Sequence, residues 1–171
     1  MIDFCFVFAD IGDMWHRTAC TEMLRSLKTV FPGANVVQLC DQEAKLHPWA
    51  DGEWRANMKA TKENYPDFHS FIITDYACNA TNPVVVSEID GIWIPADYSG
   101  PIPGGTKVRH FQHGAYVSFR ECPDKMIQFA RAVDEGKPFK EMLPKTVTLD
   151  IPREVNAGDP AFGALEIVPL T

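Results

Sequence analysis

The stretch Phe71–Pro83, FIITDYACNATNP, places one carboxylate where an apolar run gives way to small and polar residues. Asp10 and Asp41 follow two other apolar runs, DFCFVFAD and NVVQLCD, in the same way. Because the carboxyl ends of parallel strands meet at one edge of a sheet, we expect Asp75 and these acids, with Ala9, to line a ligand site there. The alternative is structural, since strand-end aspartates often cap the turn or helix that follows.

Other chemistry-bearing patterns are weaker. The chain has no GxxxxGK[ST], no GxGxxG after the first apolar run and no GxSxG, so phosphate loops and a serine nucleophile elbow are disfavoured. His110 and His113, with Asp75 and Cys78, could ring a metal ion in a metal-dependent hydrolase. A strand places positions i and i+3 on opposite faces, so the histidines share a ligand only across a turn. His113 beside Gly114 is the better candidate for ligand contact.

Size and composition limit the class of protein. With 171 residues, 46% of them hydrophobic, one domain covering 1–171 is expected. The net charge is −7 and no Lys/Arg-rich run occurs, which disfavours nucleic acid as a partner. The first apolar run is short and interrupted by acids, which indicates a buried strand and neither a signal peptide nor a membrane span. Five cysteines without a CxxC pair indicate reduced thiols in a cytoplasmic protein.

The apolar periodicity predicts strands alternating with helices. DFCFVFAD, a helix starting near Asp13 and ending at Pro32-Gly33, and the strand NVVQLCD make a βαβ unit. EWRANMKATKENY is predicted to be a helix and FHSFIIT a strand ending at Asp75. VVVSEIDGIWIPAD predicts one or two strands, HFQHGAYVSF a strand with a turn or close approach at Gly114, and CPDKMIQFARAVDEG a helix. The predicted fold class is α/β, with a mainly parallel central sheet flanked by helices.

The order of these pieces resembles the nucleotide-diphospho-sugar transferases of the GT-A fold, in particular short glycosyltransferase-like proteins of bacteriophages and prophages. The stretches that carry the resemblance are FVFAD with its helix, FPGANVVQLCD, FIITDYA, and the pair FQHGAYVSFRECPDKMIQF and AGDPAFGAL. The resemblance implies a protein that binds a sugar nucleotide at the strand ends and transfers the sugar to an unknown acceptor.

The resemblance also implies roles for individual residues. Asp75 would bind a divalent cation, Mn or Mg, or the donor ribose, and Asp159 would be the general base. Arg55, on the helix predicted before the third strand, would face the donor phosphates. The residues implied in donor binding are Ala9, Asp10, Asp41, Arg55, His113 and Gly114.

Three departures from the family pattern leave two functions open. The metal motif reads Asp75-Tyr76-Ala77 and lacks its second carboxylate, Gln112 stands where an asparagine is expected, and Pro160 replaces a glutamine. The chain is then either a glycosyltransferase in which an arginine or lysine offsets the charge of the leaving group, or a catalytically inactive binding protein of the same fold.

Overall fold

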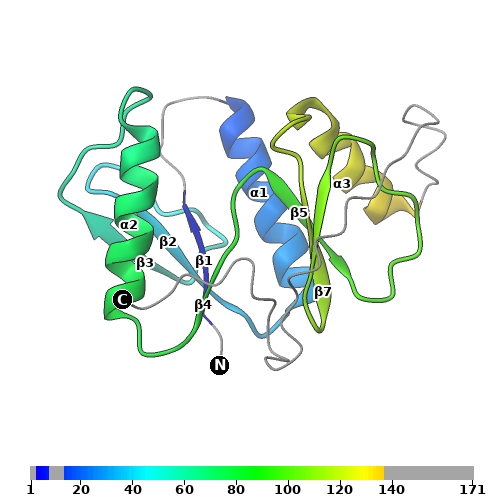
Figure 1. The fold of residues 1–171 in the computed structure, drawn as a ribbon, viewed down its shortest axis with the longest axis horizontal. Coiled ribbons are helices and arrows are strands. Elements are labelled where there is room, and N and C mark those ends of the chain that lie inside the picture. Colours follow the sequence, from blue (N-terminus) through cyan, green and yellow to red (C-terminus); the bar gives the residue numbers. More distant parts are fainter. Residues whose placement is uncertain (1–2, 8–13, 137–171) are drawn as a thin grey trace.

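Residues 3–7 and 14–136, described by a computed structural model, form a mixed α/β fold with three α-helices and two sheets (Figure 1). The elements in chain order are β1 (Asp3–Val7), α1 (Met14–Val30), β2 (Asn35–Asp41), β3 (Gly52–Ala56), α2 (Tyr65–Asn79), β4 (Val84–Val86), β5 (Gly91–Pro95), β6 (Lys107–His110), β7 (Gly114–Ser118), a 3₁₀ turn (Pro123–Lys125) and α3 (Met126–Glu135). The α/β class is confirmed. The expectation of one mainly parallel sheet is not met, because the strands divide between a parallel and an antiparallel sheet.

The parallel sheet, sheet A, has the order β3-β2-β1-β4. The chain winds from β1 through α1 to β2 on one side and later returns to place β4 on the other side of β1. The direction of winding therefore reverses between β1 and β4. Open parallel sheets bind ligands in the crevice outside the carboxyl ends of their strands at such a reversal.

The helices α1 and α2 cover opposite faces of sheet A. Val37 and Leu39 of β2 pack in one buried cluster with Phe68 and Ile72 of α2, whereas Val36 packs in the cluster that contains α1. This follows from the alternation of side chains along a strand. Figure 1 shows α2 crossing sheet A, and α1 between this sheet and β5. No helix of the described ranges is both long and apolar enough to span a membrane.

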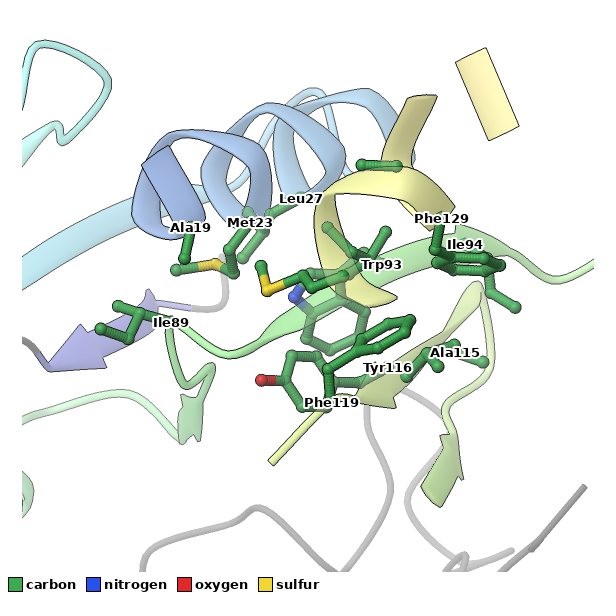
Figure 2. Close-up of a cluster of buried hydrophobic side chains, with 14 of the residues drawn as sticks. Ala19, Met23, Leu27, Ile89, Trp93, Ile94, Ala115, Tyr116, Phe119 and Phe129 are labelled. Atoms are coloured by element: carbon green, nitrogen blue, oxygen red, sulfur yellow. The ribbon is translucent and has the colours of Figure 1, made fainter. Parts of the chain in front are cut away.

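The antiparallel sheet, sheet B, has the order β5-β7-β6 and is attached to α1 through Trp93. The Trp93 backbone N–H donates to Ser26 Oγ of α1 at 2.9 Å, and its indole N–H donates to Ser87 Oγ at 2.8 Å. The ring of Tyr116 lies 5.2 Å from that of Trp93. Figure 2 shows Trp93 in the middle of the buried cluster, between α1 and β7. The indole N–H and the backbone N–H of Trp93 therefore both have an acceptor, as buried polar groups require.

The stretch predicted as a strand ending at Asp75 is the helix α2, which corrects that prediction. Phe68, Ile72 and Tyr76 are buried and recur at every fourth residue, the spacing of a helix face. Pro66 stands in the first turn, where the missing N–H costs nothing, so it starts the helix instead of breaking it. A short run such as Phe71-Ile72-Ile73 does not by itself separate a strand from a buried helix.

The helix predicted over 53–65 is also wrong. Its first residues form β3, the edge strand of sheet A, and the rest form a loop before α2. The loop is fixed by hydrogen bonds that a helix would not make: the Ala60 N–H donates to Asp41 Oδ2 at 2.8 Å, and Thr61 N–H donates to Asn64 Oδ1 at 2.7 Å. Tertiary contacts therefore determine the structure of this segment, and they override its helical propensity.

His47 holds the loop between β2 and β3 in its neutral form. Thr21 Oγ1 donates to the Arg17 carbonyl at 3.0 Å, so it accepts from His47 Nε2, 3.0 Å away. The Trp49 backbone N–H donates to His47 Nδ1 at 3.2 Å, which requires that nitrogen to be unprotonated. Burial lowers the pKa of His47 in the same direction.

This arrangement predicts an acid-sensitive contribution to stability. Because folding favours the neutral imidazole, the contribution is fully present above the unfolded pKa of about 6.5 and is lost as the pH falls through the lower folded pKa. The free energy of unfolding, measured by urea denaturation across this range, should fall less with acid in His47→Gln than in the wild type. His113→Gln, at an exposed position in the turn between β6 and β7, is the control. Parallel pH profiles for His47→Gln and the wild type would contradict the assignment.

Candidate functional site

Two carboxylates follow β4 at the reversal in sheet A. Glu88 and Asp90 are half-buried and flank Ile89, which is 6% exposed and packs into the core. The buried isoleucine fixes the chain between them, so both acids are presented from a rigid segment. The sequence signal was present, because an acid-x-acid pair follows the apolar run VVVS directly. It was missed because Asp75 had been taken for the strand-end acid.

Glu88 is held by a histidine from the first turns of α2. His69 Nε2 lies 3.3 Å from Glu88 Oε1, and the Tyr65 ring stacks edge-on 5.8 Å from the His69 ring. The hydrogen bond from His69 lowers the pKa of Glu88, and the positive charges of Arg120 and Arg109 act in the same direction. Glu88 is therefore kept ionised and oriented.

Asp90 has the opposite electrostatic environment. Burial raises its pKa first, and the neighbouring charge of Glu88 raises it further. The Tyr116 hydroxyl donates to the Glu88 carbonyl at 2.7 Å and lies 3.4 Å from Asp90 Oδ1. Burial, and then the charges of Glu88 and Asp90, also raise the pKa of the Tyr65 hydroxyl. Two acids whose pKa values are pushed in opposite directions are typical of a functional site.

Asp41 lies at the carboxyl end of β2 as predicted, but its carboxylate is directed at the backbone. Oδ1 accepts from the N–H groups of Glu43 and Ala44 at 3.0 and 2.9 Å, and Oδ2 accepts from Ala60 at 2.8 Å. The residue is only 7% exposed. For Asp41 the geometry supports the structural alternative, a cap of two loops, over the predicted contact with a nucleotide.

Arg55 lies on β3 and not on a helix. One guanidinium nitrogen donates to the carbonyls of Asp41 and Ala44 at 2.9 and 2.7 Å, and another lies 2.6 Å from Glu53 Oε2. The side chain thus joins the ends of β2 and β3. Its position gives no support to the predicted contact with donor phosphates, because these donors already have protein acceptors.

Asp75 lies in the last third of α2, and its Oδ2 accepts the indole N–H of Trp54 at 2.8 Å. Ala77 is fully buried, so Asp75-Tyr76-Ala77 is a stretch of helix and not a metal motif. A helix that connects two parallel strands runs back along them, which carries Asp75 away from their carboxyl ends. The metal role predicted for Asp75 depended on a strand-end position that Glu88 and Asp90 have instead.

His113 and Gly114 lie at the turn between β6 and β7, on the far side from Glu88 and Asp90. A Cβ on Gly114 would stand 2.6 Å from Val30 Cγ1 and 2.9 Å from the Ile94 carbonyl oxygen, so the predicted close approach at this glycine is confirmed. Val30 ends α1, which runs back from the carboxyl end of β1 to the start of β2. His113 and Gly114, which were predicted to contact the sugar, therefore do not lie beside Glu88 and Asp90.

The remaining predicted site residues, Ala9, Asp10 and Asp159, lie outside the described residues. Within the described part, no group of three or more His, Cys, Asp or Glu side chains is arranged to hold a metal ion. The set proposed for a hydrolase, Asp75, Cys78, His110 and His113, therefore forms no such group. Any cation at Glu88 and Asp90 would need further oxygen ligands from a bound molecule or from outside the described ranges.

No protein-family model matches the chain, and no curated protein matches it in a sequence search.

Proposed function

We propose that the chain is a sugar-nucleotide-binding protein of the GT-A type, which binds its donor at the carboxyl ends of β1 and β4 and transfers the sugar to an acceptor. The observation that carries the proposal is the pair Glu88 and Asp90, directly after the strand where the winding of sheet A reverses. The order β3-β2-β1-β4 is that of the first part of a doubly wound nucleotide-binding sheet.

The pair Glu88 and Asp90 would supply the second acid that Asp75-Tyr76-Ala77 lacks. The family resemblance implies an Asp-x-Asp at a strand end, and Glu88-Ile89-Asp90 fits that position better than Asp75-Tyr76-Ala77 does. The missing carboxylate was the main reason to regard the chain as an inactive copy of the fold. The two acids after β4 therefore support a transferase over an inactive copy of the fold.

The donor set fits a hard divalent cation such as Mg²⁺ or Mn²⁺. Glu88 and Asp90 would supply carboxylate oxygens, and the donor diphosphate and waters would complete the shell. Such an ion, when bound, would offset the negative charge that develops on the leaving diphosphate. Burial and then the charge of Glu88 raise the pKa of Asp90, and a bound cation would offset the second of these effects. His69 would hold Glu88 in position through its hydrogen bond.

A second candidate is a protein that binds the same ligand without turnover. It is favoured by the contact between His69 and Glu88, because a cation must compete with the imidazole for that carboxylate. In this case Asp90 and the nearby arginines would contact the ligand directly, as electrostatic stabilisation does not require a metal.

Calorimetric titration with a panel of sugar nucleotides, with and without Mn²⁺, tests the proposal. At least one should bind, and Asp90→Asn should weaken that binding about tenfold or more, the loss expected for one charge-assisted contact. Asp124→Asn, at an exposed position in the 3₁₀ turn, is the matched control. Release of the nucleotide over time separates the enzyme from the binding protein. Failure of every sugar nucleotide to bind the wild type would refute both.

A further inference from the structure

Sheet B carries a small pocket next to Glu88. Its volume is about 110 Å³, and its charged lining comes from Lys107, Arg109, Arg120, Glu88 and Glu121. We call it the β6–β7 pocket. Sites for whole drug-sized ligands measure about 300–1,000 Å³. The β6–β7 pocket therefore suits one small group of a ligand better than an entire nucleotide.

The strand register brings the cations to one face. Lys107 pairs with Ser118 and Arg109 pairs with Tyr116 across the antiparallel ladder, and directly opposed residues share a face. The intervening pair, Val108 and Val117, is fully buried on the other face. Lys107, Arg109 and Ser118 thus lie on the face that opens on the pocket, beside the buried ring of Tyr116.

Two of the three cations on this face, Lys107 and Arg120, have no ion-pair partner among the described residues. Lys107 and Arg109 lie two positions apart on β6 and so place like charges on one face, where a bound anion would offset their repulsion. The collection also stands out from a chain whose net charge is −7. Three cations against two carboxylates, one of which is bound by His69, leave the pocket suited to a negative group.

The side chains present fit a phosphoryl group in particular. An arginine fork can donate two parallel hydrogen bonds to phosphate oxygens, and a lysine adds a point charge. The Ser118 hydroxyl lines the pocket as a further donor. Gly105 also lines it, with a φ of 86° that favours glycine, and a Cβ at this position would lie 3.4 Å from Cys122 Sγ.

We infer that the β6–β7 pocket binds a phosphoryl group through Lys107 and Arg120. The group belongs either to the diphosphate of a nucleotide or to a separate phosphorylated molecule, such as an acceptor. The inference does not depend on the proposed transferase function, because it rests only on the pocket and the charges that line it.

Titration with pyrophosphate and inorganic phosphate tests the inference on the whole chain. The wild type should bind pyrophosphate, and Arg120→Gln and Lys107→Gln should each weaken binding about tenfold. Arg131→Gln and Lys62→Gln, at exposed positions on α3 and before α2, are the matched controls and should bind like the wild type. Absence of pyrophosphate and phosphate binding, or an equal loss in the controls, would overturn the inference.

Competition identifies the source of the group. Uridine diphosphate that displaces phosphate would assign the pocket to a nucleotide diphosphate, whereas simultaneous binding of uridine diphosphate and glycerol phosphate would assign it to a second, phosphorylated ligand. Either outcome supports a phosphoryl site. Pyrophosphate binding that depends on Arg120, together with no binding of any sugar nucleotide, would contradict only the proposed function.

Discussion

Gly91→Ala is expected to lower the free energy of unfolding by about 1–3 kcal/mol, the usual cost of overpacking a core. An alanine Cβ there would stand 2.0 Å from Tyr116 Cζ and 2.1 Å from its hydroxyl oxygen. Tyr116 is 3% exposed, and its hydroxyl is bound to the Glu88 carbonyl, so the ring cannot move without losing that contact. The variant should therefore disturb the acidic pair as well as the core.

Urea denaturation of Gly91→Ala, Gly52→Ala, Tyr116→Ala and the double variant Tyr116→Ala/Gly91→Ala measures this effect. Gly52→Ala, in strand β3 with no atom within 4 Å of the added Cβ, is the matched control and should be near neutral. In a Tyr116→Ala background the Gly91→Ala change should cost much less, because the clashing ring is gone. If Gly91→Ala and Gly52→Ala were equally stable in the wild-type background, the packing of Tyr116 over Gly91 would be wrong.

Asp41→Ala is expected to destabilise the fold by about 3 kcal/mol or more. Three backbone N–H groups from two loops converge on this buried carboxylate, and hydrogen bonds to a charged acceptor contribute about 1.5–3 kcal/mol each. The loops between β2 and α2 would lose their common anchor. Thermal or urea unfolding measures the change, with Asp97→Ala at an exposed position as the control.

A second substitution of Asp41 distinguishes a structural role of this residue from a role in ligand binding. Asp41→Asn keeps one side-chain carbonyl oxygen as an acceptor and should retain enough structure for titration at low temperature. If Asp41 acts only on the loops, the folded fraction of Asp41→Asn should bind sugar nucleotides with wild-type affinity. A stable Asp41→Asn protein with lost affinity would instead restore the predicted contact with the ligand.

The first βαβ unit could be predicted because its signals agree with one another. The helix α1 has a sustained apolar face and ends before Pro32-Gly33, and β2 is a short, mainly apolar run, so propensity, period and breakers lead to one answer. The pairing of sheet B and its attachment to α1 through Trp93 depend on contacts between distant residues. A single sequence does not contain that information.

The candidate site shows how one error in secondary structure propagates. Because Phe71-Ile72-Ile73 was predicted to be a strand, Asp75 was taken for the acid at its end. The Asp-x-Asp motif of the resembled family was then matched to Asp75-Tyr76-Ala77. The true strand, β4, is only three residues long, and the acids after it lie within a stretch, VVVSEIDGIWIPAD, that was predicted as one or two strands without a boundary between them. Short buried strands give weak periodicity, so the pair Glu88 and Asp90 became visible only once the sheet order was known.

The most direct test of the proposed site is the change in backbone amide NMR shifts when a sugar nucleotide is added. If the ligand binds at the carboxyl end of β4, the largest changes should fall on Ser87–Gly91 and on the first two turns of α2, around His69. They should disappear in Asp90→Asn and persist in Asp124→Asn. Changes confined to the opposite end of sheet A, at Thr81–Pro83, or no changes with any sugar nucleotide, would contradict the site.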